Sequence, residues 1–382
     1  MLWIVGAGAI VTALEGMGAN PLTDLLAIQL QHVEWEGFRF YDLIFPLFLF
    51  IVGVSVVFSL DKALAQGGRA RVLSRVFRRG LLLFAAGVFY YGGLSKAWPE
   101  VQLGGVLHRI AVCYVCAALI YSFVRSPRWL GVVCALLLTG FWALVTYVAV
   151  PDFKLEREVV EEIAERIGSD SPFDIAAGVP GRVTGLYEEG RNLVNHFDFL
   201  YLPGRKAQLY YLNEGILSTL PAIALTLFGV LAGLLLKSDS EGAIRKIAWL
   251  VGAGVALILL GLLWSVSFPL IKRIWTSSFV LVAGGCSALL LALFYWMVDV
   301  RRWSGWCQPF IWVGCNAFTI YLVSPIVNFK MLASRFTGGD VSRFFDRHFA
   351  AGLGDLVTAC TGLLLVILFA RFLYRRQIFL RV

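Results

Sequence analysis

The stretch from Gln31 to Leu60 reads QHVEWEGFRFYDLIFPLFLFIVGVSVVFSL. Its first twelve residues include one histidine, three carboxylates and an arginine. The 18 residues that follow, from Leu43 on, carry no charge and only two hydroxyls, Ser55 and Ser59. An apolar run of this length can cross a bilayer as a helix. Titratable groups at the mouth of such a helix are costly unless they face water or protein partners, so this stretch is where we expect chemistry.

The composition of the whole chain is that of a polytopic membrane protein. Of its 382 residues, 59% are hydrophobic and 15% are charged, whereas a soluble domain has about 45–50% apolar and about 25% charged residues. The net charge of +8 would also suit a nucleic-acid partner. The basic residues, however, lie between apolar stretches, as the positive-inside rule predicts. We therefore expect a lipid bilayer as the partner and no nucleic acid.

Ten apolar stretches predict an all-α integral membrane protein with about ten transmembrane helices in a single domain, residues 1–382. Helices are expected because lipid leaves the backbone no other way to satisfy its polar groups. The first stretch is too short to cross alone and has no charged region before it, which leaves open a native start upstream of Met1. The stretches are residues 1–14, 43–60, 76–93, 103–123, 130–150, 216–236, 245–264, 276–298, 308–329 and 356–374.

The distribution of charge predicts the orientation in the membrane. If the loop 61–79 is cytoplasmic, alternation of the spans places seventeen basic and four acidic residues on that side, and 16 basic and 21 acidic residues on the other. This imbalance favours both termini in the cytoplasm and places His32 on the outer side.

The longest polar segment is the outer loop 151–215. Within it, apolar residues recur every four positions and predict an amphipathic helix that ends at Gly168; they are Leu155, Val159, Ile163 and Ile167. The apolar stretch 197–204 is expected to pack back onto the membrane domain. A loop of this length is usually functional, for example as a substrate platform, and a solvated cover without a role is the alternative.

His32 is the first candidate for catalysis. An imidazole has an unperturbed pKa of about 6.5, so it can transfer protons near neutral pH, and it can also accept an acyl group. A loop histidine without a role is the alternative. Asp42 has two readings that can hold together. It either caps the helix that follows by accepting the free amides of the first turn, or it orients His32.

Four further polar residues lie at the edges of predicted spans or inside one. Arg109 opens the fourth span, where a guanidinium can bind phosphate or carboxylate through two hydrogen bonds. Glu214 precedes the sixth span. Lys272 precedes the eighth on the outer side, against the positive-inside trend, and anchoring at the interface is its alternative role. Asn316 lies inside the ninth span, where an amide most often joins neighbouring helices.

The remaining motifs argue against several classes of site. Cys113 and Cys116 form a C-x-x-C on a predicted membrane helix without a second pair or a nearby histidine, so packing is the better interpretation and no metal site is expected. The sequence has no Walker-type Gly-Lys-Ser, no dinucleotide-binding G-x-G-x-x-G after a strand, no H-E-x-x-H and no G-x-S-x-G. Nucleotide hydrolysis, Rossmann dehydrogenation and serine-hydrolase chemistry are therefore poorly supported.

Several segments, in the order of the chain, resemble the heparan-alpha-glucosaminide N-acetyltransferase family. The resemblance covers nearly the whole chain apart from residues 151–195. The acidic-x-x-Arg-Gly stretch typical of the family is absent before the first span, and Gly6 stands where the lysosomal enzymes are expected to carry an asparagine. The segments are HVEWEG (32–37), DLIFP (42–46), GVLHRI (105–110), EGIL (214–217), KRIWT (272–276), Asn316 with Tyr321, and YRRQIF (374–379).

The resemblance implies a membrane acyltransferase that moves acetyl from cytosolic acetyl-CoA to an amino-sugar or glycan acceptor on the outer, periplasmic side. The implied location is the inner membrane of a bacterium. The family's motif histidine is catalytic, which implies His32 as acyl acceptor or general base, with Asp42 beside it. A homodimer is compatible with the sequence. The residues expected to bind substrate are Glu34, Trp35, Arg109, Glu214, Lys272, Trp275 and Asn316, with the two tryptophans suited to stacking on a sugar ring.

Two other function classes remain. A transporter or flippase for a glycan or an anionic small molecule could use the same intramembrane polar residues as a path, although no pair of broken helices in repeated halves is visible. A membrane scaffold without activity is the second. Turnover of the acetyl-CoA thioester separates the enzyme from both.

Overall fold

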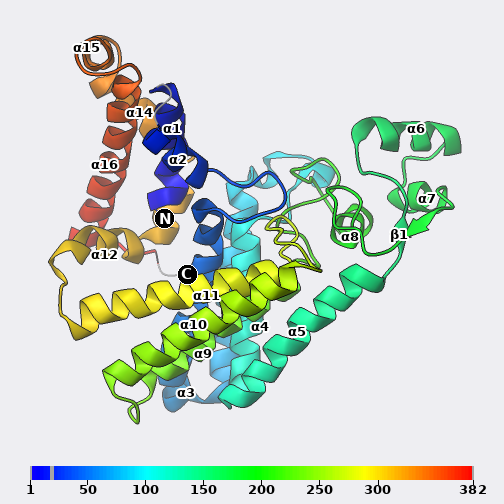
Figure 1. Cartoon of the computed structure of the whole chain (residues 1–382), viewed down its shortest axis with the longest axis horizontal. Coiled ribbons are helices and arrows are strands. Elements are labelled where there is room, and N and C mark those ends of the chain that lie inside the picture. The colour runs from blue at the N-terminus through cyan, green and yellow to red at the C-terminus, as the bar shows by residue number, and fades with distance from the viewer. Residues whose placement is uncertain (1, 18–20, 381–382) are drawn as a thin grey trace. The chain divides into compact units, whose positions relative to one another are not determined.

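The computed structural model describes residues 2–17 and 21–380, and nearly all of its regular structure is helical, as the sequence predicts (Figure 1). The helices are α1 (Leu2–Gly16), α2 (Pro21–Gln29), α3 (Ile44–Tyr90), α4 (Val106–Phe123), α5 (Pro127–Tyr147), α6 (Arg157–Ile167), α7 (Pro172–Ala177), α8 (Leu193–Tyr201), α9 (Thr219–Lys237), α10 (Ala243–Ser265), α11 (Ser277–Phe294), α12 (Gln308–Cys315), α13 (Ala317–Val323), α14 (Phe329–Thr337), α15 (Asp340–His348) and α16 (Leu353–Arg375). Two short antiparallel strands pair, β1 (Val150–Pro151) and β2 (Arg182–Val183). Short 3-10 turns are η1 (Phe40–Leu43), η2 (Gly93–Ser95), η3 (Trp98–Glu100) and η5 (Gly305–Cys307), and η4 (Tyr295–Val300) is a π-helix.

The chain forms two compact units, and the prediction of a single domain over 1–382 stays a prediction. Unit 1 comprises residues 1–34, 39–44 and 294–382. Unit 2 comprises residues 35–38 and 45–293.

Seven helices among the described residues are long and apolar enough to cross a membrane. They match seven of the ten predicted spans, and the count of ten stays a prediction. The seven are Phe40–Leu64, Val106–Phe123, Pro127–Tyr147, Thr219–Lys237, Ala243–Ser265, Ser277–Val300 and Leu353–Arg375.

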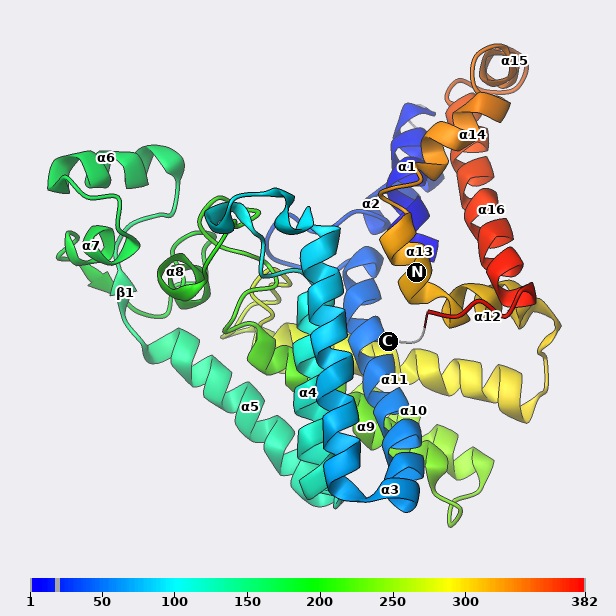
Figure 2. The ribbon, with the colours of Figure 1, turned by 180° about the vertical axis from the view of Figure 1, so that it is seen from behind.

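The other three predicted spans take different forms. Residues 76–93 fall mainly in the second arm of α3, which reverses direction at Gly68 (φ +73°) and continues to Tyr90 (Figure 2). The first span corresponds to the 15-residue α1, and its first residue lies outside the described part of the chain. Residues 308–329 are not one helix. Asn316 leaves the helical conformation between α12 and α13, and α13 ends two residues before Pro325, which has no N–H to continue the hydrogen bonds of the helix.

Unit 2 is a bundle of α3, α4, α5, α9, α10 and α11 (Figures 1 and 2). Within it, α3 and α9 approach closely at two glycines. A Cβ atom on Gly53 would lie 1.9 Å from the Thr226 carbonyl oxygen, and one on Gly229 would lie 1.9 Å from the Phe50 carbonyl oxygen. Small residues permit this approach, and dispersion contacts between close backbones are a main source of helix association in lipid.

One end of unit 2 is basic. The kink of α3, the α4–α5 connection and the α9–α10 connection lie there (Figures 1 and 2). Asp61 ties them together: it accepts a hydrogen bond from Tyr121 (3.0 Å) and pairs with Arg125 (3.4 Å) and with Lys237. The basic residues in these segments are Lys62, Arg69, Arg71, Arg75, Arg78, Arg79, Arg125, Arg128, Lys237, Arg245 and Lys246. The part of the charge pattern that lies in unit 2 therefore gathers at one end of the bundle.

Loops from distant parts of the chain meet at the other end of unit 2. Glu36 pairs with Ile271 and Gln102 with Gly204 as isolated antiparallel bridges, and the Gly37 N–H donates to the Leu270 carbonyl (2.8 Å). Residues 35–38 are thus held beside the segment before α11, and the segment before α4 is held beside the connection between α8 and α9.

A small helical extension follows α5 and comprises α6, α7, α8 and the two strands (Figure 1). The predicted amphipathic helix is confirmed as α6, and Gly168 ends it in the left-handed conformation (φ +69°). Its apolar face joins a buried cluster that includes Val160, Ile163, Ile175, Phe199 and Tyr211. Gly204 lies against the Val101 carbonyl, in the connection before α4, and the packing of 197–204 onto the membrane domain stays a prediction.

Unit 1 is organised around α16. Residues Val366 and Ala370 of α16 form a buried cluster with Val313, Ile320 and Phe329 from α12, α13 and α14. A second cluster joins α1 to α2 and Leu30. The loop that follows α2 carries His32 and returns through η1 to the start of α3.

We expect the glycine contact between α3 and α9 to be intolerant of any side chain. Gly53→Ala should lower the free energy of unfolding by about 1–3 kcal/mol, because the added methyl must push the two backbones apart. Gly140→Ala on α5 is the matched control: nothing lies within 4 Å of a Cβ there, and alanine is the better helix former. Thermal unfolding of the detergent-purified variants measures both, and equal melting temperatures for the two variants would contradict the close packing.

Candidate functional site

The loop between α2 and η1 places His32 against Asp42. The Nδ1 atom of His32 lies 2.8 Å from Oδ1 of Asp42. The imidazole is half exposed, with 51% of its side-chain surface accessible, whereas the carboxylate is 1% accessible. The His32 ring also lies against Tyr41, with ring centroids 4.4 Å apart. The pair therefore combines a buried acceptor with a ring that faces solvent.

Asp42 occupies the first turn of η1 and also satisfies the backbone around it. Its Oδ2 atom accepts the N–H of Arg39 (3.1 Å) and the N–H of Val33 (3.3 Å). The Arg39 side chain in turn donates to the His32 carbonyl (3.2 Å). The contact with His32 is made by Oδ1, whereas Oδ2 accepts N–H groups of two residues that precede Asp42. The cap predicted for the first turn of the helix that follows stays a prediction.

The contact determines which tautomer of His32 is favoured. A carboxylate can only accept, so a neutral His32 donates its Nδ1–H to Asp42 and carries its lone pair on Nε2. This is the arrangement in which a carboxylate orients an imidazole for proton transfer.

Arg109 is the second polar centre, and it belongs to unit 2. It lies in the first turn of α4 and is 2% exposed. Its Nη2 atom donates to the carbonyl oxygens of Asn213 (3.1 Å) and Gly215 (3.2 Å) and to the Ser218 hydroxyl. The guanidinium carbon lies 4.9 Å from the centre of the Trp275 ring. Arg109 thus joins the start of α4 to the segments before α9 and α11.

Two of the nitrogen atoms of Arg109 have no partner among the described residues. Nε and Nη1 are buried and lack a hydrogen bond in the part of the chain that the structure describes. The neighbouring His108, between Phe84 and Tyr91, likewise has both ring nitrogens unpartnered there. Buried donors without acceptors are costly. They are therefore compatible with the predicted role of Arg109 in binding an anion.

Asp198 is a residue that the sequence reasoning missed. It is fully buried on α8, and its two oxygens accept the N–H groups of Ile216 (3.0 Å) and Leu212 (3.3 Å). A Cβ on Gly215 would lie 1.8 Å from its Oδ2 atom. Burial raises the pKa of Asp198 to about 6, although the two N–H groups and Arg109 oppose this shift. The one feature of the sequence that could have pointed to Asp198 is that it is a single acidic residue within an apolar run.

Asp198 and Arg109 together fix the segment that contains Glu214. The carboxylate accepts from N–H groups of residues 212–216, while the guanidinium donates to carbonyls of the same segment. Gly215 of the EGIL motif therefore has a structural role, because the Asp198 carboxylate leaves no room for a side chain there. Glu214 itself is half-buried.

The tryptophans predicted to stack on substrate both have packing contacts. Trp275 is 1% exposed and adopts a left-handed backbone conformation (φ +55°), with its ring against Phe45 and Phe279. Trp35 is half-buried and donates its indole N–H to the Tyr187 carbonyl (2.8 Å). Their contacts with a sugar stay predictions, and the burial of Trp275 leaves little of its ring accessible.

The remaining predicted residues are divided between the units. Lys272 is half-buried in unit 2, beside Arg273, which pairs with Glu189 (2.6 Å). Glu34 is exposed in unit 1. Asn316, also in unit 1, is 1% exposed and donates to the Trp312 carbonyl (3.1 Å), while its Oδ1 atom has no partner among the described residues.

The structure therefore brings the predicted residues together in two groups. His32 and Asp42 form one, and Arg109 and Trp275 form the other, beside the segment of Glu214. In the described ranges 2–17 and 21–380, no group of three or more His, Cys, Asp or Glu side chains is arranged to hold a metal ion.

Comparison with known proteins identifies relatives of this chain. Residues 19–155 match the family model described as "Heparan-alpha-glucosaminide N-acetyltransferase, catalytic". The heparan-alpha-glucosaminide N-acetyltransferases of Mus musculus and Homo sapiens are each 27% identical to it, over 335 and 337 residues, which is 76% of this chain and 48% of either relative. The chain spans about half the length of these relatives. The resemblance seen in the sequence motifs is confirmed.

The Asp198 carboxyl predicts a pH-dependent difference in stability. The pKa of this carboxyl is raised from 3.8 to about 6 in the folded protein. Its protonated form therefore stabilises the fold at pH values below about 4, and this stabilisation is lost as the pH rises through 6. The free energy of unfolding of the wild type minus that of Asp198→Asn should therefore fall by roughly 2 kcal/mol between pH 4 and pH 7.

Chemical unfolding of both proteins across this range measures the difference. His196, whose pKa burial lowers to about 4, is present in both proteins, so its contribution cancels. Asp170→Asn, at an exposed position, is the control and should give a difference that does not change with pH. A constant difference for Asp198→Asn as well would show that the carboxyl is not held in this environment.

Proposed function

We propose that this chain is a membrane-embedded acyltransferase that moves acetyl from cytosolic acetyl-CoA to an amino-sugar or glycan acceptor on the outer side of a bacterial inner membrane. The observation that carries the proposal is the His32–Asp42 pair, a half-exposed imidazole held by a buried carboxylate at 2.8 Å. Both residues lie inside the segment 19–155 that matches the catalytic family model. The relatives bear the name of an N-acetyltransferase.

The pair supports transfer by general base catalysis. Asp42 accepts the Nδ1–H of His32, so Nε2 is the ring nitrogen that takes the proton of the acceptor amine or hydroxyl. The acceptor lone pair attacks the thioester carbonyl carbon, and the carbon–sulfur bond breaks. The imidazolium then gives its proton to the departing thiolate, which leaves as CoA. The buried carboxylate stabilises the positive ring in between, as in other histidine–carboxylate pairs.

A route through acetyl-His32 is the alternative order of the same chemistry. There Nε2 itself attacks the thioester, CoA leaves, and the acceptor takes the acetyl group from the ring in a second step. The same two residues serve both routes, and only the presence or absence of a labelled protein separates them.

The donor is a polyanion, and unit 2 offers a basic end for it. The residues around the α3 kink and the α4–α5 and α9–α10 connections would attract its phosphates from the cytoplasm. Arg109 is the candidate for a further anionic group, because its Nε and Nη1 atoms lack partners among the described residues. The acceptor residues Glu34, Trp35, Glu214, Lys272, Trp275 and Asn316 stay candidates on the resemblance alone.

One observation favours the transporter reading. Residues 308–329 form a helix broken at Asn316, whose buried Oδ1 atom has no partner in the described part of the chain. Broken helices line substrate sites in many transporters. A transporter has no need to cleave a thioester, so CoA release distinguishes the two functions.

We expect His32→Ala to lower acetyl-CoA turnover by about 10²–10⁴-fold, since the proton transfer it performs is removed. Detergent-purified protein is incubated with radiolabelled acetyl-CoA and glucosamine, and free CoA and labelled product are measured. His348→Ala is the matched control, because His348 is exposed at the end of α15 and should leave turnover unchanged. Asp42→Asn should lower kcat with little change in KM for acetyl-CoA.

Each outcome has a defined meaning. Label that remains on wild-type protein without acceptor, and is absent from His32→Ala, indicates the acetyl-histidine route. Full turnover by a folded His32→Ala variant would exclude His32 from the chemistry. A wild type that neither binds nor cleaves acetyl-CoA would remove the acyltransferase proposal and favour transport.

A further inference from the structure

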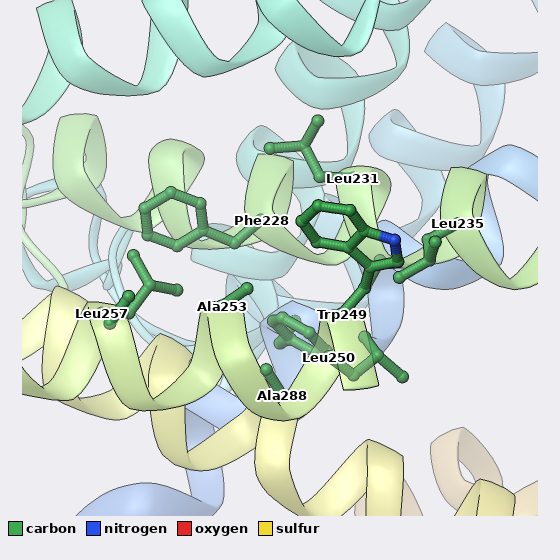
Figure 3. Close-up of a pocket in the computed structure, with 11 residues that line it drawn as sticks. Phe228, Leu231, Leu235, Trp249, Leu250, Ala253, Leu257 and Ala288 are labelled. Atoms are coloured by element: carbon green, nitrogen blue, oxygen red, sulfur yellow. The ribbon is translucent and has the colours of Figure 1, made fainter. Parts of the chain in front are cut away.

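Helix α10 leaves an apolar cavity between itself and its neighbours in unit 2. The cavity has a volume of about 450 Å³, with walls from α9 (Phe228, Leu231, Leu235) and α10 (Trp249, Ala253, Leu257). These side chains face one another across the space between the two helices (Figure 3). A second cavity of about 480 Å³ shares Phe228 and Leu257 and continues toward α5. Both volumes are in the range of small-molecule binding sites.

The cavity is accessible from the lipid side of the bundle. Only 17% of the most apolar 18-residue stretch of α10 is buried inside the protein, and Trp249 is 62% exposed at the edge of the cavity. Both helices are apolar enough to span the membrane. Hydrocarbon, and not water, therefore surrounds the opening, and an acyl chain fits apolar walls of this kind without leaving a polar group unsatisfied.

A buried positive charge lies at one end of this cavity. Lys246 is 9% exposed and sits one turn before Trp249 and Leu250, which both line the cavity. Its ammonium donates to the Leu236 carbonyl on α9 (2.7 Å), next to the lining residue Leu235. No carboxylate lies within ion-pair distance of Lys246 among the described residues. A buried ammonium without an anion is costly, so its surroundings favour an anionic partner.

A second cation stands beside it on the same turn. Arg245 has 78% of its side-chain surface exposed and lies 4.0 Å from Glu241. Lys237, by contrast, is paired with Asp61. Lys246 and Arg245 thus present positive charge where the α9–α10 connection begins, and the apolar cavity extends away from them along the helices.

We propose that this cavity holds an acyl chain of an anionic phospholipid whose phosphate lies against Lys246 and Arg245. Charge decides between a lipid and a second copy of the chain. A second copy docked in the same orientation would bring its own basic end against this one and raise the repulsion. An anionic phospholipid supplies the missing negative charge and the apolar chain together. The proposal does not depend on acyl transfer.

Native mass spectrometry of the detergent-purified protein tests it, with phosphatidylglycerol and phosphatidylcholine of identical chains as probes. The wild type should retain phosphatidylglycerol preferentially. Lys246→Gln with Arg245→Gln should reduce this preference roughly tenfold or more, since each basic residue near the surface adds to the attraction. Arg69→Gln with Arg71→Gln, exposed on α3 at the same basic end, is the matched control and should keep the preference.

A second pair of variants tests the apolar part. Ala253→Trp places a large side chain in the cavity and should abolish retention of both lipids. Leu259→Trp, exposed on the same helix but outside the lining, should not. If the Lys246 variant fails to give monodisperse protein, Arg245→Gln alone and Ala253→Trp decide the question.

Two results would overturn the proposal. One is equal retention of the two lipids by the wild type. The other is a change from dimer to monomer in Ala253→Trp, measured by light scattering, while lipid retention stays as in the wild type. That result would assign the cavity to a second copy of the chain.

Discussion

The segment between α8 and α9 depends on two opposite charges that hold its backbone from either side. Asp198 accepts the N–H groups of Leu212 and Ile216, and Arg109 donates to the carbonyls of Asn213 and Gly215. Neither helix nor sheet satisfies these groups, so buried side chains must. The guanidinium also lies over Trp275. The starts of α4, α9 and α11 are therefore fixed by one buried polar network, and a change to either charge leaves several groups unsatisfied at once.

The same principle explains how a surface loop can present His32 in one orientation. A loop histidine is normally mobile, because an exposed ring gains little from any single position. Asp42 removes this freedom, since it is anchored by two backbone N–H groups before it contacts the ring. The carboxylate is buried while the imidazole is half exposed. Asp42 thus keeps the ring of His32 in one orientation, while the ring itself stays accessible to solvent.

Much of this architecture could be predicted from the sequence. Apolar length predicted seven spans that the structure contains, and the four-residue repeat from Leu155 predicted α6 up to its terminal glycine. The contact of His32 with Asp42 is one of the two readings that their places before one helix allowed. The break at Asn316 did not, because an apolar run does not distinguish one helix from two short ones, although Pro325 limited its length. Asp198 was missed for a related reason, since a single acid in an apolar run gives no indication of its partner 14 or 18 residues later.

The similarity to the acetyltransferase family extends this argument beyond single residues. The matched segment ends at residue 155 and includes His32, Asp42 and Arg109. The carbonyls that hold Arg109 belong to residues 213 and 215, and the ring beneath it is Trp275. A protein cut at residue 155 would lack both the carbonyls that accept from Arg109 and the ring that covers it, so the buried environment of this guanidinium would not form. The matched segment therefore does not form the surroundings of Arg109 alone. The later helices α9 and α11 are needed for them, which gives a physical reason for the likeness of the EGIL and KRIWT motifs, far outside the segment that carries the histidine.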